Sequence, residues 1–148
     1  MGGINYKRVR RVGVVSKPKE SDHQAAYFGW LKTVFVMLGP ERHPLWNFAY
    51  AIPNGTMFAG DSRQRAIYMN SLKKQGFKVG VSDVNIDLPR GPYHGARFEL
   101  KRDKTSKVSE EQKAWCGLMA RAGYYARIVC GYDEIVAETR NYLSMNRS

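Results

Sequence analysis

Residues 96–101 alternate strictly between apolar and charged side chains, and this pattern constrains the fold more than any other feature of the sequence. The even positions are apolar, and the odd positions are Arg97, Glu99 and Lys101. Successive side chains of a β-strand point to opposite faces of the sheet. The segment is therefore predicted to be a strand with one face in the core and a charged face opposite.

A second segment, residues 81–88, has the same alternation and is predicted to pair with residues 94–101 as a hairpin. The turn between them centres close to Gly91, so a symmetric register pairs residues whose numbers sum to 182. That register places Asp83 directly opposite Glu99. Like charges in this position destabilise a sheet. A divalent cation would offset the repulsion, because Mg²⁺ is commonly held by one or two carboxylates with waters and substrate phosphates.

Lys101 lies on the same predicted face, two residues beyond Glu99. Beside a metal ion it would position or deprotonate a water, or stabilise negative charge in the transition state. The alternative is that Asp83 and Glu99 are ordinary solvated residues on an exposed sheet face, or that a bulge breaks the register.

Hydrophobic periodicity and capping residues predict the remaining elements. The predicted helices cover residues 20–38, 61–75, 109–123 and 133–145, and the other predicted strands cover residues 46–52 and 124–130. The fold class is therefore α/β, with the order α-β-α-β-β-α-β-α and a mixed β-sheet flanked by helices. A right-handed crossover should place the last strand parallel to its sheet neighbour.

Two predicted helix starts bring further polar residues toward the same region. Glu20 and Gln24 are four residues apart and share the inner face of the first helix. Gln112 shares the inner face of the third helix with Trp115. Each has an alternative role, because the helix dipole favours an acid in the first turn and Ser109 with Gln112 forms a capping box.

The charge of the chain indicates its partner. The 148 residues suffice for one ordinary domain, with 24 Lys and Arg residues against 13 Asp and Glu and a net charge of +11. A domain this basic is expected to bind a polyanion, with nucleic acid as the leading candidate. Residues 1–19 hold six basic residues and no acid, so they are predicted to form a basic N-terminal arm preceding a domain of residues 20–148.

Several classes of protein are disfavoured by the sequence. No apolar run is long enough to span a membrane. Cys116 and Cys130 have neither zinc-site spacing nor a disulfide framework, which agrees with a reducing cytoplasm. The three histidines are scattered, and no arrangement typical of a nucleophilic triad is present.

Six short motifs follow one another along the chain: Ala51-Ile-Pro-Asn-Gly55, Gly80-Val-Ser-Asp83, Tyr93-His-Gly95, Phe98-Glu-Leu-Lys101, Ser109-Glu-Glu-Gln112 and Gly123-Tyr124. Each is weak alone, but their order and spacing resemble the VRR-NUC family, the virus-type replication-repair nucleases of the PD-(D/E)xK superfamily. The resemblance runs from about residue 20 to residue 143. It implies the restriction-endonuclease-like core of that superfamily and a phage-type single-domain member.

The resemblance also implies roles for particular residues. Asp83 and Glu99 would be metal ligands, Lys101 the catalytic lysine, and Gln112 the family's glutamine after the ExK strand. Glu20 would be the acidic residue of the first helix and a further catalytic and metal-binding group.

Two departures from the family pattern qualify these assignments. Asp22 is only two residues from Glu20 and could be the first-helix acid instead. Ser82 stands where the superfamily name expects proline, which removes a rigid turn and no metal ligand.

The implied activity is that of a metal-dependent endodeoxyribonuclease using Mg²⁺, with Mn²⁺ as a substitute. The expected substrate is branched DNA, including Holliday junctions, cut by a homodimer in DNA repair or recombination. The expected location is the cytoplasm of a bacterium or a phage-infected host. The alternatives are an inactive DNA-binding module of the same fold, a monomeric flap or nicking nuclease, and an enzyme acting on RNA.

Overall fold

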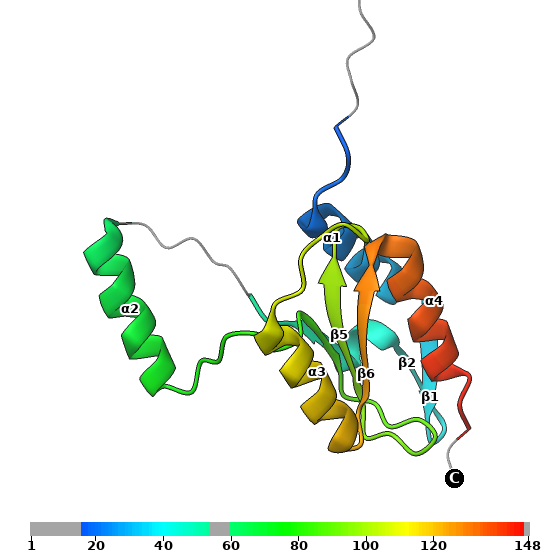
Figure 1. The fold of residues 1–148 in the computed structure, drawn as a ribbon. Coiled ribbons are helices and arrows are strands. Elements are labelled where there is room, and N and C mark those ends of the chain that lie inside the picture. Colours follow the sequence, from blue (N-terminus) through cyan, green and yellow to red (C-terminus); the bar gives the residue numbers. More distant parts are fainter. Residues whose placement is uncertain (1–15, 54–59, 147–148) are drawn as a thin grey trace, which may run out of the picture.

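A four-stranded sheet forms the centre of the protein in the computed structural model, which describes residues 16–53 and 60–146 (Figure 1). Its strands lie in the order β3 (Ala49–Ala51), β4 (Val84–Ile86), β5 (Ala96–Lys101) and β6 (Tyr125–Cys130). Strand β4 is antiparallel to both β3 and β5, and β6 runs parallel to β5. The predicted mixed sheet and its parallel last strand are therefore confirmed.

The hairpin register predicted from the turn at Gly91 is also confirmed. Val84 pairs with Phe98 and Ile86 with Ala96, so each pair sums to 182. Asp83 directly precedes β4, and the same register extended by one residue places it opposite Glu99. The register therefore brings together the two carboxylates that the alternation had singled out.

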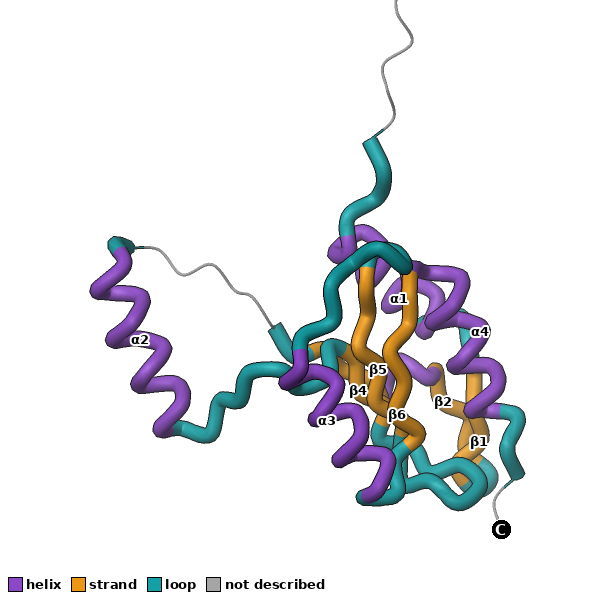
Figure 2. Tube along the Cα trace, viewed as in Figure 1, coloured by secondary structure: helices purple, strands orange, loops and turns teal. Residues whose placement is uncertain are grey.

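Helices cover both faces of the sheet (Figures 1 and 2). Helices α1 (Glu20–Leu31) and α4 (Gly131–Leu143) pack on each other and on the apolar face, where the core cluster includes Phe98 and Leu100 of β5. Helix α3 (Glu110–Arg121) packs on β5 and β6 from the other side. Apolar packing therefore fixes β5 from one face and leaves its polar face opposite α3.

Helix α2 (Ser62–Lys74) stands apart from this body in both views (Figures 1 and 2). None of its residues is buried. Its predicted N-cap, Asp61, accepts a hydrogen bond from the backbone N–H of Gln64. Gly76 follows the helix with a positive φ of 94°, as expected for a C-terminal glycine.

The prediction of a single helix over residues 20–38 is wrong in its second half. Helix α1 ends at Leu31, and the chain then forms a hairpin of β1 (Phe35–Leu38) and β2 (Glu41–Pro44). The apolar residues after Leu31 fit helical spacing, but the β-branched and aromatic side chains of residues 33–36 favour a strand. Gly39, with a φ of 61°, makes the two-residue turn that closes the hairpin.

The other expected elements differ only at their ends. The predicted strand over residues 46–52 begins as a short 3₁₀ helix, η1 (Leu45–Phe48), and only then becomes β3. Within the described residues, no helix has the length and apolar content needed to cross a membrane. Of the expected basic arm, residues 1–15 lie outside the described residues, and residues 16–19 are exposed.

Candidate active site

Three charged residues are buried side by side where β4 begins and β5 ends. Asp83, Glu99 and Lys101 are each less than a tenth exposed. The interpretation of these carboxylates as solvated surface residues is therefore wrong. Burying charged groups is costly unless they are paired or bind an ion. The contacts of these three residues therefore indicate how their charges are compensated.

Each carboxylate is anchored by the surrounding chain. Lys101 Nζ lies 3.0 Å from Glu99 Oε1, and the side-chain amide of Gln112 donates a hydrogen bond to the same oxygen. Asp83 Oδ2 accepts a hydrogen bond of 3.0 Å from the backbone N–H of Leu100. The hairpin backbone thus fixes Asp83, and the first turn of α3 fixes Glu99.

The environment of Glu99 opposes its ionisation. Burial and, after it, the negative charge of Asp83 raise the pKa of this carboxyl group to about 7, although Lys101 acts in the opposite direction. An additional positive charge nearby would therefore stabilise the ionised form of Glu99.

A divalent cation fits these residues. Glu99 Oε2 is buried and has no hydrogen-bond partner among the described residues, although it lies in the polar cluster with Asp83. Two carboxylates completed by water and phosphate oxygens are an ordinary ligand set for Mg²⁺. Within residues 16–53 and 60–146, no group of three His, Cys, Asp or Glu residues is close enough to hold one ion.

Glu20 lies at the start of α1, at the edge of the same cluster. It lines a pocket of about 330 Å³ together with Gln24 and Asp83. Although Glu20 is exposed as a whole, loss of water around its carboxyl group raises its pKa, Lys101 lowers it and Asp83 raises it. The structure therefore brings Glu20 beside the predicted site without completing a three-carboxylate metal cluster.

Comparison with known proteins supports the fold that carries this cluster. No protein-family model and no curated protein matches the sequence. A solved structure named "VRR_NUC domain protein" superimposes with a TM-score of 0.74, at 25% sequence identity, over 90% of this chain and 96% of that one.

The chain has the fold of a VRR-NUC domain. Its mixed sheet flanked by helices agrees with the PD-(D/E)xK-like fold that the sequence motifs implied. The similarity supports a nuclease-family domain in general.

In this VRR-NUC domain, Gln112 has two roles that the sequence presented as alternatives. Its Oε1 accepts a hydrogen bond of 3.0 Å from the backbone N–H of Ser109, completing the capping box. Its Nε2 donates to Glu99. One amide therefore closes the first turn of α3 and holds the catalytic candidate.

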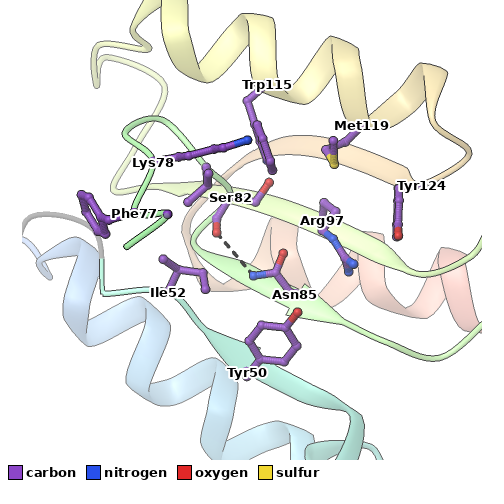
Figure 3. Close-up of a pocket in the computed structure, with 12 residues that line it drawn as sticks. Tyr50, Ile52, Phe77, Lys78, Ser82, Asn85, Arg97, Trp115, Met119 and Tyr124 are labelled. Carbon is purple, nitrogen blue, oxygen red and sulfur yellow. Dashed lines mark hydrogen bonds between the residues drawn. The ribbon is translucent and has the colours of Figure 1, made fainter. Parts of the chain in front are cut away.

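Sequence reasoning missed a second hollow of the VRR-NUC domain, next to the cluster on the polar face of the sheet. This pocket has a volume of about 480 Å³ (Figure 3). The available signal was the spacing of Trp115 and Met119 behind Gln112, which places all three on one face of α3. That face was interpreted as core packing, whereas part of it lines an open pocket.

Proposed function

We propose that this VRR-NUC domain hydrolyses phosphodiester bonds in DNA, with a divalent metal ion held by Asp83 and Glu99. The observation that carries the proposal is the buried Glu99 carboxylate, whose Oε2 has no hydrogen-bond partner among the described residues and which lies beside a second carboxylate. The net charge of +11 supports a polyanionic substrate.

Each residue of the cluster has a different role in the proposed reaction. When bound, Mg²⁺ or Mn²⁺ would polarise the phosphate and lower the pKa of a bound water. Lys101, held against Glu99, orients the attacking water and stabilises negative charge developing on the phosphate. Gln112 fixes the Glu99 carboxylate, and Glu20 lines the same pocket as Asp83.

The test compares carboxylate-to-amide variants on several substrates. Asp83→Asn and Glu99→Gln should each reduce cleavage by about 10²-fold or more, because each removes a charge that stabilises the metal-bound transition state. Binding of DNA should stay similar or strengthen, since a charge that repels phosphate has gone. Gel assays with duplex, branched DNA and RNA would measure both effects in Mg²⁺, in Mn²⁺ and in chelator.

Glu41→Gln provides a matched control, because Glu41 is an exposed carboxylate on the β1–β2 hairpin. It should cleave as the unmodified protein does. Wild-type cleavage by Glu99→Gln would contradict the assignment of the site. Binding without cleavage under every metal condition would identify an inactive DNA-binding module, and preferential cleavage of RNA would contradict DNA as the substrate.

The finer proposal is a homodimer that acts on branched DNA, including Holliday junctions. Symmetric cuts in two strands need two sites related by a twofold axis. One candidate interface is the group of aromatic residues around Trp46 and Tyr50, since these side chains are 40% and 44% exposed. The last helix offers no interface at Tyr142, because this residue is fully buried and donates a hydrogen bond to the Leu88 carbonyl.

Light scattering at micromolar concentration should give twice the mass of one chain. A monomer that makes paired symmetric cuts in a junction would contradict the link between dimerisation and resolution. A monomer that nicks only flaps would replace the proposal.

A further inference from the structure

The pocket of about 480 Å³ lies on the polar face of the sheet, between β3, β4, β5 and α3 (Figure 3). Its volume falls in the range of roughly 300–1,000 Å³ that is typical of sites for small organic groups. Four aromatic side chains line it: Tyr50, Phe77, Trp115 and Tyr124. Two cationic side chains, Lys78 and Arg97, lie among them.

Arg97 is held rigidly in this pocket. Its guanidinium carbon lies 4.2 Å from the centre of the Tyr124 ring, and Nη2 lies 3.0 Å from Asp87 Oδ1. Nη1 also donates a hydrogen bond of 2.9 Å to the Ala96 carbonyl. A planar cation fixed on an aromatic ring offers a stacking surface for another flat group.

Trp115 supplies an unsatisfied donor at the opposite wall. Its indole Nε1 is buried and has no hydrogen-bond partner among the described residues. Buried polar groups of this kind are normally paired, so the site lacks one acceptor. Lys78 Nζ, 5.9 Å from the centre of the Trp115 ring, adds positive charge at the rim.

The wall formed by the loop between α2 and β4 is packed against α3. Gly80 has a φ of 79°, and a Cβ added there would lie 2.8 Å from Glu111 Cβ. The loop that carries Phe77 and Lys78 therefore approaches the first turn of α3 as closely as a glycine allows. Close packing of this loop on α3 therefore forms one wall of the pocket.

The pocket lies next to the candidate active site. Ser82 lines it and directly precedes Asp83. Arg97 lies two residues before Glu99 on the same strand face, a separation of about 7 Å at the usual rise of a strand. A nucleotide whose phosphate lies at the two carboxylates can therefore reach the pocket with its base.

From these contacts we propose that the pocket binds one unpaired nucleobase of the strand that is cut. This inference rests on the proposed function. Aromatic walls and a fixed guanidinium stack on the flat faces of a base, and the Trp115 N–H donates to one of its acceptors. A base inside a duplex is stacked and paired, whereas an unpaired base enters without that cost. The pocket would thus select for DNA that is frayed or branched at the cut.

The proposal can be tested by removing one base at a time from the DNA. The probe is a fluorescein-labelled duplex with a single-stranded flap, in versions that each carry one abasic nucleotide near the branch. Binding to the full chain is measured in chelator by fluorescence anisotropy. Loss of the base that enters the pocket should weaken binding about tenfold, a typical effect of one stacked base, while loss of bases several positions away should not.

Variants of the pocket sharpen this measurement. Trp115→Ala should weaken binding of intact DNA and abolish the difference between intact and abasic DNA at the sensitive position. Trp115→Phe, which keeps a ring and loses the N–H, should give an intermediate difference. Phe35→Ala is the matched control, because Phe35 is also an aromatic side chain under a cation, Arg42, at 3.8 Å, but lies outside the pocket.

Equal affinity for every abasic version would overturn the proposal, and this outcome depends on no protein variant. A position-dependent loss that persists unchanged in Trp115→Ala would also overturn it, because the base would then bind elsewhere. Cleavage of the same DNA with Mg²⁺ tests the proposed function separately. A base-specific binding signal without cleavage would support base binding in the pocket and contradict the proposed hydrolysis. Cleavage without a base-specific signal would support hydrolysis and contradict base binding in the pocket.

Discussion

Helices α2 and α3 carry nearly the same local signals and yet differ completely in their surroundings. Each begins at a capping box with glutamine at the third helical position, and each is followed by a glycine with positive φ. Helix α3 lies on the sheet and touches the active-site cluster. Neither helix has a fully buried residue, but α2 stands apart from the sheet (Figures 1 and 2). Capping thus determines where a helix begins and ends. The tertiary contacts of the helix determine whether it can take part in a site.

The two glutamines allow this difference to be measured directly. Gln112→Ala and Gln64→Ala each remove one capping-box hydrogen bond and should each lower the free energy of unfolding by about 1 kcal/mol or less. Only Gln112→Ala should reduce cleavage, by about 10–100-fold, because it also releases Glu99 from its supporting donor. Urea denaturation and single-turnover cleavage would separate the two effects. Equal activity of both variants would show that Gln112 is only a cap.

The pH dependence of stability gives a second distinction. Burial and the nearby Asp83 hold the pKa of Glu99 at about 7 in the folded protein, against 4.5 for an ordinary glutamate. The folded state therefore binds this proton more tightly than the unfolded state. The contribution to stability is present below pH 4.5 and is lost as the pH rises toward 7.

Urea midpoints at several pH values in chelator would test this expectation. Glu99→Gln should remove the decline between about pH 5 and 7, because the amide does not titrate. Mg²⁺ should stabilise the protein more at pH 8 than at pH 5, since it binds the ionised carboxylate. Gln64→Ala, far from this carboxyl group, should leave the pH profile unchanged. An identical decline in Glu99→Gln would assign the titration to another residue.

The smallest predicted effect concerns the cationic residues of α2. The helix carries Arg63, Arg65, Lys73 and Lys74 and no acidic residue. If it lies along the substrate, changing all four to glutamine should flatten the plot of log affinity against log salt by up to about 0.9 for each lost phosphate contact. The matched control changes Lys113 and Arg121 of α3. An unchanged slope would show that α2 does not reach DNA.

The features predicted correctly from the sequence are those that depend on near neighbours in the chain. Asp61 and Ser109 cap their helices by bonds three residues away, and the short turn at Gly91 fixes the β4–β5 register. The register and the strand alternation suffice to bring Asp83 and Glu99 together. The proximity of these two carboxylates could therefore be predicted without a structure.

What the sequence did not predict depends on distant contacts. Phe35 fits the helical spacing of α1, but it is 47% exposed on a strand, so its spacing had no link to the core. Trp115 has the period of a core residue, yet it lines a pocket because the loop around Lys78 stands opposite it. Periodicity shows that a face is apolar and does not show whether protein, ligand or water covers it.

The double contact of Gln112 also has a consequence for local dynamics. Because one amide closes the first turn of α3 and restrains Glu99, fraying of that turn frees the carboxylate as well. Helix ends open far more often than the whole protein unfolds. The fraction of molecules with an ordered Glu99 carboxylate therefore depends on the opening equilibrium of one helical turn, and protection of the Gln112 amide from hydrogen exchange would report it.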